Sequence, residues 1–126
     1  MKGRKFETSS RKVVPILIGE QGYVIQEMTG SDRSEYLNKM SENRLRIDVG
    51  DKAETRIQRL GDLELDILLP CLYYADVKEI GDEFEIMEVL DRVPASVIAD
   101  MPASLVVELS KEAREVNGLG GKAGNG

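Results

Sequence analysis

The sequence contains no histidine and a single cysteine, Cys71. Without histidine, Ser-His-Asp and Cys-His catalytic groups cannot be assembled, and a zinc site built from cysteine and histidine is excluded. One cysteine cannot form an internal disulfide framework, which fits a reducing cytoplasm. Because Cys71 lies in the most apolar stretch of the chain, we expect a buried, unreactive thiol. Most residues used for catalysis are therefore missing, but carboxylates remain as possible acid/base groups or ligands of hard metal ions, so the composition leaves an enzyme possible.

Long apolar segments and an excess of positive charge are also absent. The most apolar run, residues 60–75, is shorter than the roughly 20 residues needed to span a bilayer. The charged N-terminus is followed by no apolar segment of the kind found in signal peptides. The formal net charge is −6, whereas phosphate binding needs a cationic footprint. We therefore expect a cytoplasmic protein that binds neither nucleic acid nor membrane.

The 126 residues are 41% hydrophobic and 32% charged, which is typical of one globular domain. We expect that domain to cover residues 13–118. Residues 1–12 carry five lysines and arginines and are predicted to be a flexible basic tail. Residues 119–126 are rich in glycine and are predicted to be a second flexible tail.

The apolar run at residues 60–75 is predicted to be the central core helix. Its apolar residues form two stripes at helical spacing, one of Leu60, Leu63, Ile67, Cys71 and Tyr74, the other of Leu65, Leu68 and Leu72. Pro70 lies inside the run, where it is expected to kink the helix or to split it in two. A ligand groove opened by that kink is the alternative interpretation.

The N-terminal part predicts a β-hairpin. Residues 13–18 and 23–28 are rich in β-branched and aromatic side chains, and a short connection bounded by Gly19 and Gly22 joins them. Pro15 cannot donate to a central ladder, so its strand is expected at a sheet edge. Such a hairpin needs to pack on helices or to pair with another chain.

Five further segments are predicted to be helical. The first starts at Thr29, with Tyr36, Leu37 and Met40 facing inward, and runs to about residue 43. Residues 44–49 fit a strand or an extension of this helix. Short helices are expected at 53–60 and 94–98, and a longer one from Pro102 to Asn117. Residues 82–91 are predicted to form an amphipathic helix whose carboxylates face solvent. The expected fold class is α+β, mostly helical, with the N-terminal β-hairpin packed on about five helices.

Four stretches, taken in order, carry a resemblance to a known family. The hairpin ends in Tyr23-Val-Ile-Gln-Glu-Met-Thr-Gly, and a helix opens with Ser-Asp-Arg-Ser-Glu-Tyr-Leu. The apolar run contains Leu-Leu-Pro-Cys-Leu-Tyr, and the domain closes with Leu-Ser-Lys-Glu-Ala-Arg-Glu-Val-Asn-Gly-Leu119. Over roughly residues 13–119 the chain resembles the tail assembly chaperones of long-tailed bacteriophages and prophages. It departs from them at Asp76-Val-Lys-Glu-Ile-Gly81, where the family often has a turn rich in aspartate and glycine.

This resemblance implies a non-catalytic function. Such chaperones bind the tape measure protein, keep it soluble and recruit tail tube subunits. The partners implied are therefore the tape measure protein and the tail tube protein, together with self-association. The family often makes a longer form by ribosomal frameshifting, and the glycine-rich end here is similar to the end of its short form.

A chaperone for an apolar client needs replaceable apolar contacts in acidic surroundings. Methionine and aromatic side chains adapt to varied partners, so we expect the contact residues among Met28, Tyr73, Tyr74, Phe84, Met87, Leu90 and Met101. Each of them is also an ordinary candidate for the core. We expect no catalytic residue, metal ligand or cofactor-binding residue.

Two other functions remain open from the sequence. The first is a small acidic host adaptor or regulatory domain that binds a basic protein partner. The second is a metal enzyme that uses the carboxylates of Asp62, Glu64 or Asp66, although Asp62 and Asp66 also fit an ordinary solvated pair on a helix.

Overall fold

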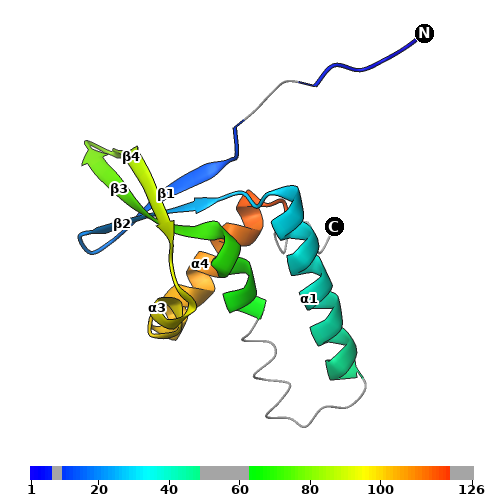
Figure 1. Ribbon diagram of the computed structural model, residues 1–126. Coiled ribbons are helices and arrows are strands. Elements are labelled where there is room, and N and C mark those ends of the chain that lie inside the picture. Colours follow the sequence, from blue (N-terminus) through cyan, green and yellow to red (C-terminus); the bar gives the residue numbers. More distant parts are fainter. Residues whose placement is uncertain (7–9, 49–62, 120–126) are drawn as a thin grey trace.

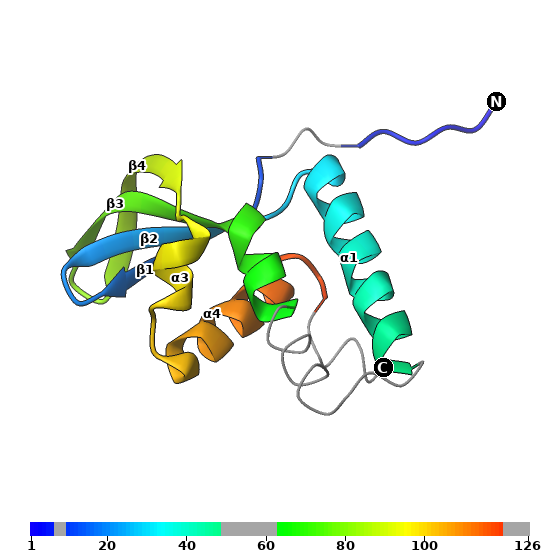
Figure 2. The same cartoon turned by 60° about the horizontal axis from the view of Figure 1, so that its bottom comes forward.

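The chain forms one four-stranded antiparallel sheet with helices gathered on one side of it (Figures 1 and 2). The computed structural model describes residues 1–6, 10–48 and 63–119. Within them the strands are β1 (Val13–Ile18), β2 (Gln21–Gln26), β3 (Leu72–Ile80) and β4 (Glu83–Arg92), in the spatial order β1-β2-β3-β4. The helices are α1 (Gly30–Asp48), a helical segment over residues 63–71, α3 (Ala95–Ala99) and α4 (Ala103–Val116).

The predicted fold class is wrong in its arrangement of strands. An N-terminal hairpin was expected to be the whole β-structure, packed on about five helices. Instead, β3 and β4 come from the second half of the chain and extend the hairpin into a larger sheet. Four helical segments are found in the described residues, and the helix predicted at 53–60 lies outside them.

The N-terminal hairpin is confirmed. β1 and β2 pair from Val13 with Gln26 to Ile18 with Gln21, so two residues form the turn. Gly19 in that turn has a φ of 64°, a left-handed conformation that glycine adopts without steric cost. β1 is an edge strand, as its proline predicts, because it pairs with β2 along one edge and with no strand of the described chain along the other.

The predicted helix at 60–75 ends early. Residues 63–71 are helical, residues 60–62 lie outside the described part, and Leu72 begins β3. Leu72, Tyr73 and Tyr74 pair with β2 in antiparallel register, and this pairing satisfies their backbone groups in place of helical bonds. Pro70 therefore lies in the last turn of a continuous helix and does not split a longer one. The interior position is confirmed for Ile67, Leu68 and Cys71, which are fully buried.

The predicted helix at 82–91 is wrong, since this segment is strand β4. Ile80 pairs with Glu83, so Gly81 and Asp82 form a two-residue turn, and Gly81 has a φ of 64°. The ladder between β3 and β4 contains two register shifts. Every residue of β4 except Ile86 is exposed, so the strand has no buried face. Polar and apolar residues alternate only from Glu83 to Ile86, and the alternation breaks at Met87. The spacing of three between Phe84, Met87 and Leu90 therefore suggested a helix.

The first helix begins as predicted and is longer. The side-chain oxygen of Thr29 accepts a hydrogen bond from the backbone N–H of Asp32 at 3.2 Å, which caps α1. Tyr36 is buried, and Leu37 and Met40 pack against the core. Helical backbone continues to Asp48, so residues 44–48 extend the helix and do not form a strand.

The two helices predicted near the C-terminus are confirmed. Pro94 immediately precedes α3, and Pro102 immediately precedes α4. Leu109, Ala113 and Val116 are buried on one face of α4. The helix ends at Asn117, and Gly118 has a φ of 70°. The backbone N–H of Leu119 then donates to the carbonyl of Arg114 at 2.7 Å, as expected for a glycine-terminated helix.

The core lies between the sheet and the helices. Segment 63–71 is placed between α1 and α4 in both views (Figures 1 and 2). Its buried residues pack with β2, the start of β3, α3 and α4 in one cluster that includes Tyr23, Ile25, Met28, Tyr36, Ile67, Leu68, Cys71, Leu72, Val93, Ile98, Leu109, Ala113 and Val116. Burial of this apolar surface is the main stabilising contribution to the fold.

One buried amide ties three parts of this core together. The side-chain oxygen of Asn117 accepts a hydrogen bond from the backbone N–H of Met28 at 2.8 Å. Its side-chain nitrogen donates to the carbonyl of Ala113 at 2.7 Å and to the sulfur of Cys71 at 3.4 Å. The Arg33 guanidinium donates to the backbone carbonyl of Asn117 at 2.9 Å. The end of α4 is thereby joined to the β2–α1 connection, to segment 63–71 and to α1.

The sheet is curled, and the backbone of β3 lies close to Gly22 of β2. β1 and β4 come near each other although they are at opposite ends of the strand order. A Cβ atom on Gly22 would lie 2.5 Å from the carbonyl oxygen of Ala75 and 3.0 Å from Val77. Only glycine fits at this position without moving β3.

Candidate functional site

The outer strand β4 is the most exposed regular element of the described chain. It is ten residues long, ends the strand order and has no proline. On its inner side it pairs with β3, while its outer backbone edge pairs with no strand among the described residues. An open edge of this length is a template for pairing with another chain unless it is protected.

Apolar side chains gather on the hairpin of β3 and β4. Of the nine large hydrophobic residues that are exposed in the described chain, five belong to this hairpin. We call them the β4 apolar patch: four lie on β4, and Ile80 is the last residue of β3 and lies on the face opposite to Phe84. Their exposed fractions lie between 39% and 54%, and the residues are Ile80, Phe84, Met87, Val89 and Leu90. Single exposed hydrophobic residues are common on protein surfaces, but a group of this kind on an open edge suggests a binding surface.

Carboxylates are interspersed along the hairpin with the residues of the β4 apolar patch. Seven acidic residues of the hairpin are exposed, against Lys78 and Arg92 as the cations, and these are Asp76, Glu79, Asp82, Glu83, Glu85, Glu88 and Asp91. Lys78 pairs across the strands with Glu85, whereas Asp76 lies directly opposite Glu88. Like charges in directly opposed positions destabilise a sheet. The opposed carboxylates of Asp76 and Glu88 therefore lower the stability of the hairpin.

The structure places the seven predicted contact residues in different surroundings. Phe84, Met87 and Leu90 lie together on β4 and are exposed. Met28 is buried in the core, and Met101 is half-buried against it. Ile80 and Val89 complete the exposed group and were missed. Both lie in or beside the segment that was predicted to be an amphipathic helix, and the apolar side of such a helix packs against the core.

The two tyrosines at the start of β3 have structural contacts. The ring of Tyr74 stacks on Tyr23 with centroids 5.6 Å apart. The hydroxyl oxygen of Tyr73 accepts from the Arg92 Nε at 3.0 Å and from the Arg11 guanidinium at 3.5 Å. Both guanidinium groups also lie within 6 Å of the Tyr73 ring centroid. These contacts fix the base of the hairpin and raise the pKa of Arg92, chiefly through the hydrogen bond to Tyr73.

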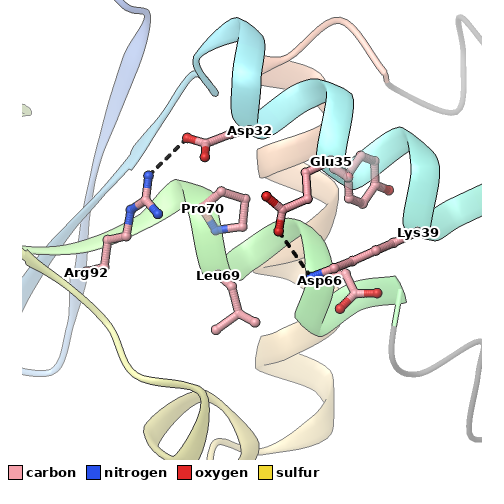
Figure 3. A pocket seen from close by; sticks show the side chains of 8 residues that line it. Asp32, Glu35, Lys39, Asp66, Leu69, Pro70 and Arg92 are labelled. Carbon is pink, nitrogen blue, oxygen red and sulfur yellow. Dashed lines mark hydrogen bonds and ion pairs between the residues drawn. The ribbon is translucent and has the colours of Figure 1, made fainter.

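A polar hollow lies between α1 and segment 63–71, beside Pro70 (Figure 3). Its volume is about 230 Å³. Arg92 forms an ion pair with Asp32 at 3.0 Å, and Lys39 forms one with Glu35 at 3.7 Å. These opposed charges line the hollow together with Tyr36, Asp66, Leu69 and Pro70. In place of the ligand groove considered at Pro70, the structure has a polar hollow in which Arg92 pairs with Asp32 and Lys39 pairs with Glu35.

The remaining chemical groups show no candidate catalytic or metal centre within the described residues. No three carboxylate or cysteine side chains there are grouped so as to hold a metal ion. Asp62 lies outside the described part, while Glu64 and Asp66 border different hollows. Burial raises the pKa of the Cys71 thiol to about 11, so the group is neutral at ordinary pH, as expected for a buried and inert thiol. No helix in residues 1–6, 10–48 and 63–119 is long and apolar enough to cross a membrane.

Comparison of the chain with protein-family models, with curated proteins and with solved structures finds no match. The exposed strand β4 is therefore the candidate site on physical grounds alone.

Proposed function

We propose that this protein is a tail assembly chaperone of a long-tailed phage or prophage and acts without catalysis in the host cytoplasm. In this proposal it binds the tape measure protein, keeps it in solution and recruits tail tube subunits. The sequence resemblance supplies the identity of the partners. The β4 apolar patch on an open sheet edge is the observation that carries the proposal.

The composition of this patch suits a temporary apolar contact. Its side chains are about half exposed in the folded protein, so a client can bind without any part of the core opening. Met87 and Phe84 can adjust to different client side chains, because methionine is conformationally adaptable and aromatic rings offer large contact areas. The surrounding carboxylates keep the complex charged, which opposes aggregation of an apolar client.

The proposal is tested by co-expression with the tape measure protein of the same genome. We expect Phe84→Asp and Met87→Asp each to lower the soluble fraction of the client several-fold, because a carboxylate would interrupt the apolar contact. Both residues are exposed on an outer strand, so the unfolding free energy of the chaperone should change by only about 1 kcal/mol or less.

Val107→Asp is the matched control. Val107 is 45% exposed, close to Phe84 and Met87, but it lies on α4 and not on the hairpin. This variant should keep the client soluble. The proposal is contradicted if Phe84→Asp and Met87→Asp remain folded and protect the client as well as Val107→Asp does.

A second candidate is an acidic adaptor domain that binds a basic partner. The opposed pair of Asp76 and Glu88 favours it, since a cationic partner would relieve that repulsion. Under this function, Glu85→Gln with Glu88→Gln would weaken partner binding strongly and make it less dependent on salt. Under the chaperone function, these substitutions would leave client solubility nearly unchanged.

A further inference from the structure

We propose that the outer edge of β4 binds the N-terminal segment of a second copy of this chain, residues 1–6, as an added strand. Peptides commonly bind an open sheet edge in this way, with backbone hydrogen bonds for affinity and side chains for specificity. The inference concerns self-association, and it goes beyond the proposed client.

The two edges of the sheet differ in their ability to accept a strand. β1 has six residues, five of them partly buried, and contains Pro15, which has no N–H to donate. β4 has ten residues, lacks proline and is exposed along almost its whole length. A strand that joins this sheet therefore adds at β4.

The charge on β4 selects the kind of strand that can bind. Pairing β4 with β4 of another copy would bring acidic residues together across the new interface, because each strand carries four carboxylates and one arginine. Like charges placed opposite each other disfavour such a pair. A strand with lysine and arginine would instead gain from the same carboxylates.

The N-terminal segment has the required chemistry. Residues 1–6 include Lys2, Arg4 and Lys5 with no acidic residue, and they end at Phe6, whose side chain is 75% exposed. In an extended strand Lys2 and Arg4 lie on one face, and Glu83 and Glu85 also share one face of β4. Six extended residues span about 20 Å, which is enough to follow the end of β4 nearest the β3–β4 turn.

The position of the segment favours a second copy over its own sheet. Arg11 and Lys12 are fixed against Glu27: the Arg11 Nε donates to the Glu27 carbonyl at 2.7 Å, and the Lys12 N–H donates to the Glu27 carboxylate at 3.1 Å. From there residues 1–6 lead away from the sheet in both views and have no regular structure (Figures 1 and 2). Binding to another copy keeps this direction, whereas binding to the same copy would require the chain to reverse.

Analytical ultracentrifugation of the full chain at low and high salt tests the inference. We expect concentration-dependent association that high salt weakens, because it depends on charge. Removal of residues 1–6 should weaken association at least about tenfold, and so should Glu83→Lys with Glu85→Lys. Glu108→Lys with Glu115→Lys makes the same change of charge at exposed sites on α4 and should leave association unchanged.

Mixing two defective variants gives the sharper result. The chain without residues 1–6 keeps an intact β4, and the Glu83→Lys, Glu85→Lys chain keeps an intact N-terminal segment. Each should be monomeric alone, and together they should form a one-to-one heterodimer. The inference is overturned if the full chain stays monomeric, if the shortened chain associates as strongly as the full chain, or if the mixture forms no heterodimer.

The shortened chain also separates this inference from the proposed function. It retains the β4 apolar patch and should still keep the tape measure protein soluble. Loss of self-association with client solubility retained would support both ideas. Loss of self-association in a protein that never protects the client would leave the inference standing and contradict the proposed function.

Discussion

Replacement of Asn117 by alanine should destabilise the protein by disconnecting the end of α4 from its neighbours. The substitution removes the acceptor for the Met28 N–H, which lies in the core, and the donors to the Ala113 carbonyl and the Cys71 sulfur. The loss of these partners has unequal costs. The Ala113 carbonyl still accepts from the backbone N–H of residue 117 at 3.2 Å, and sulfur is a weak acceptor.

The orphaned Met28 amide therefore dominates the expected loss. A buried donor without a partner costs about 1–3 kcal/mol, and the lost donation to Ala113 adds about 0.5–1.5 kcal/mol. We expect a total of about 3 kcal/mol, out of a stability of the order of 10 kcal/mol for a domain of this size. Such a loss corresponds to a decrease in Tm of about 10 °C.

Urea unfolding followed by circular dichroism measures this change in the unfolding free energy. Asn38→Ala is the control: Asn38 is an exposed residue of α1, and its replacement should change stability by no more than about 0.5 kcal/mol. Hydrogen exchange adds a local readout, because the Met28 amide should lose protection beyond the global change. A loss below about 0.5 kcal/mol for Asn117→Ala, with Met28 still protected, would refute the reasoning.

Three further predictions concern the sheet and the core. Gly22→Ala should cost about 2 kcal/mol, because its Cβ would lie 2.5 Å from a carbonyl oxygen of β3, whereas Gly30→Ala meets nothing within 4 Å and should be neutral or stabilising in the same urea assay. Because burial raises the pKa of Cys71 from 9.0 to about 11, the folded protein holds that proton more tightly than the unfolded chain does. Its contribution is complete below pH 9 and is lost as the pH rises to about 11; this pH dependence should amount to about 3 kcal/mol and be smaller in Cys71→Ala. Glu88→Lys should stabilise the protein by about 0.5 kcal/mol, less at high salt, since it turns the repulsive pair with Asp76 into an attractive one. A Glu88→Lys variant less stable than the parent at low salt would contradict that account.

The two hairpins show where reasoning from sequence succeeds and where it stops. Each has a two-residue turn of glycine and an acidic residue, Gly19 with Glu20 and Gly81 with Asp82, and both glycines have a φ of 64°. The first turn was recognised because β-branched residues flank it on both sides. The second was not, because charged residues of β4 follow it, and an apolar spacing of three suggested a helix.

The candidate site was recovered in part for the same reason. Phe84, Met87 and Leu90 were predicted as contact residues and lie together on an exposed strand. They were assigned to the wrong element, however, and Ile80 and Val89 were left out. The sequence pattern alone could not reveal the site, because a strand has an open edge only when no other strand pairs with its outer side, and this depends on the whole sheet.

Features that depend on near neighbours in the chain could be predicted without the structure. The cap at Thr29, the prolines before α3 and α4 and the end of α4 at Asn117 follow from contacts within a few residues. The buried positions of segment 63–71 follow from its apolar spacing. Tertiary structure decided the rest. Leu72 is a strand residue because β2 pairs with it, and β4 is an exposed edge because β3 alone holds it. The pairing of β2 with β3 joins residues far apart in sequence, so no local pattern specifies it.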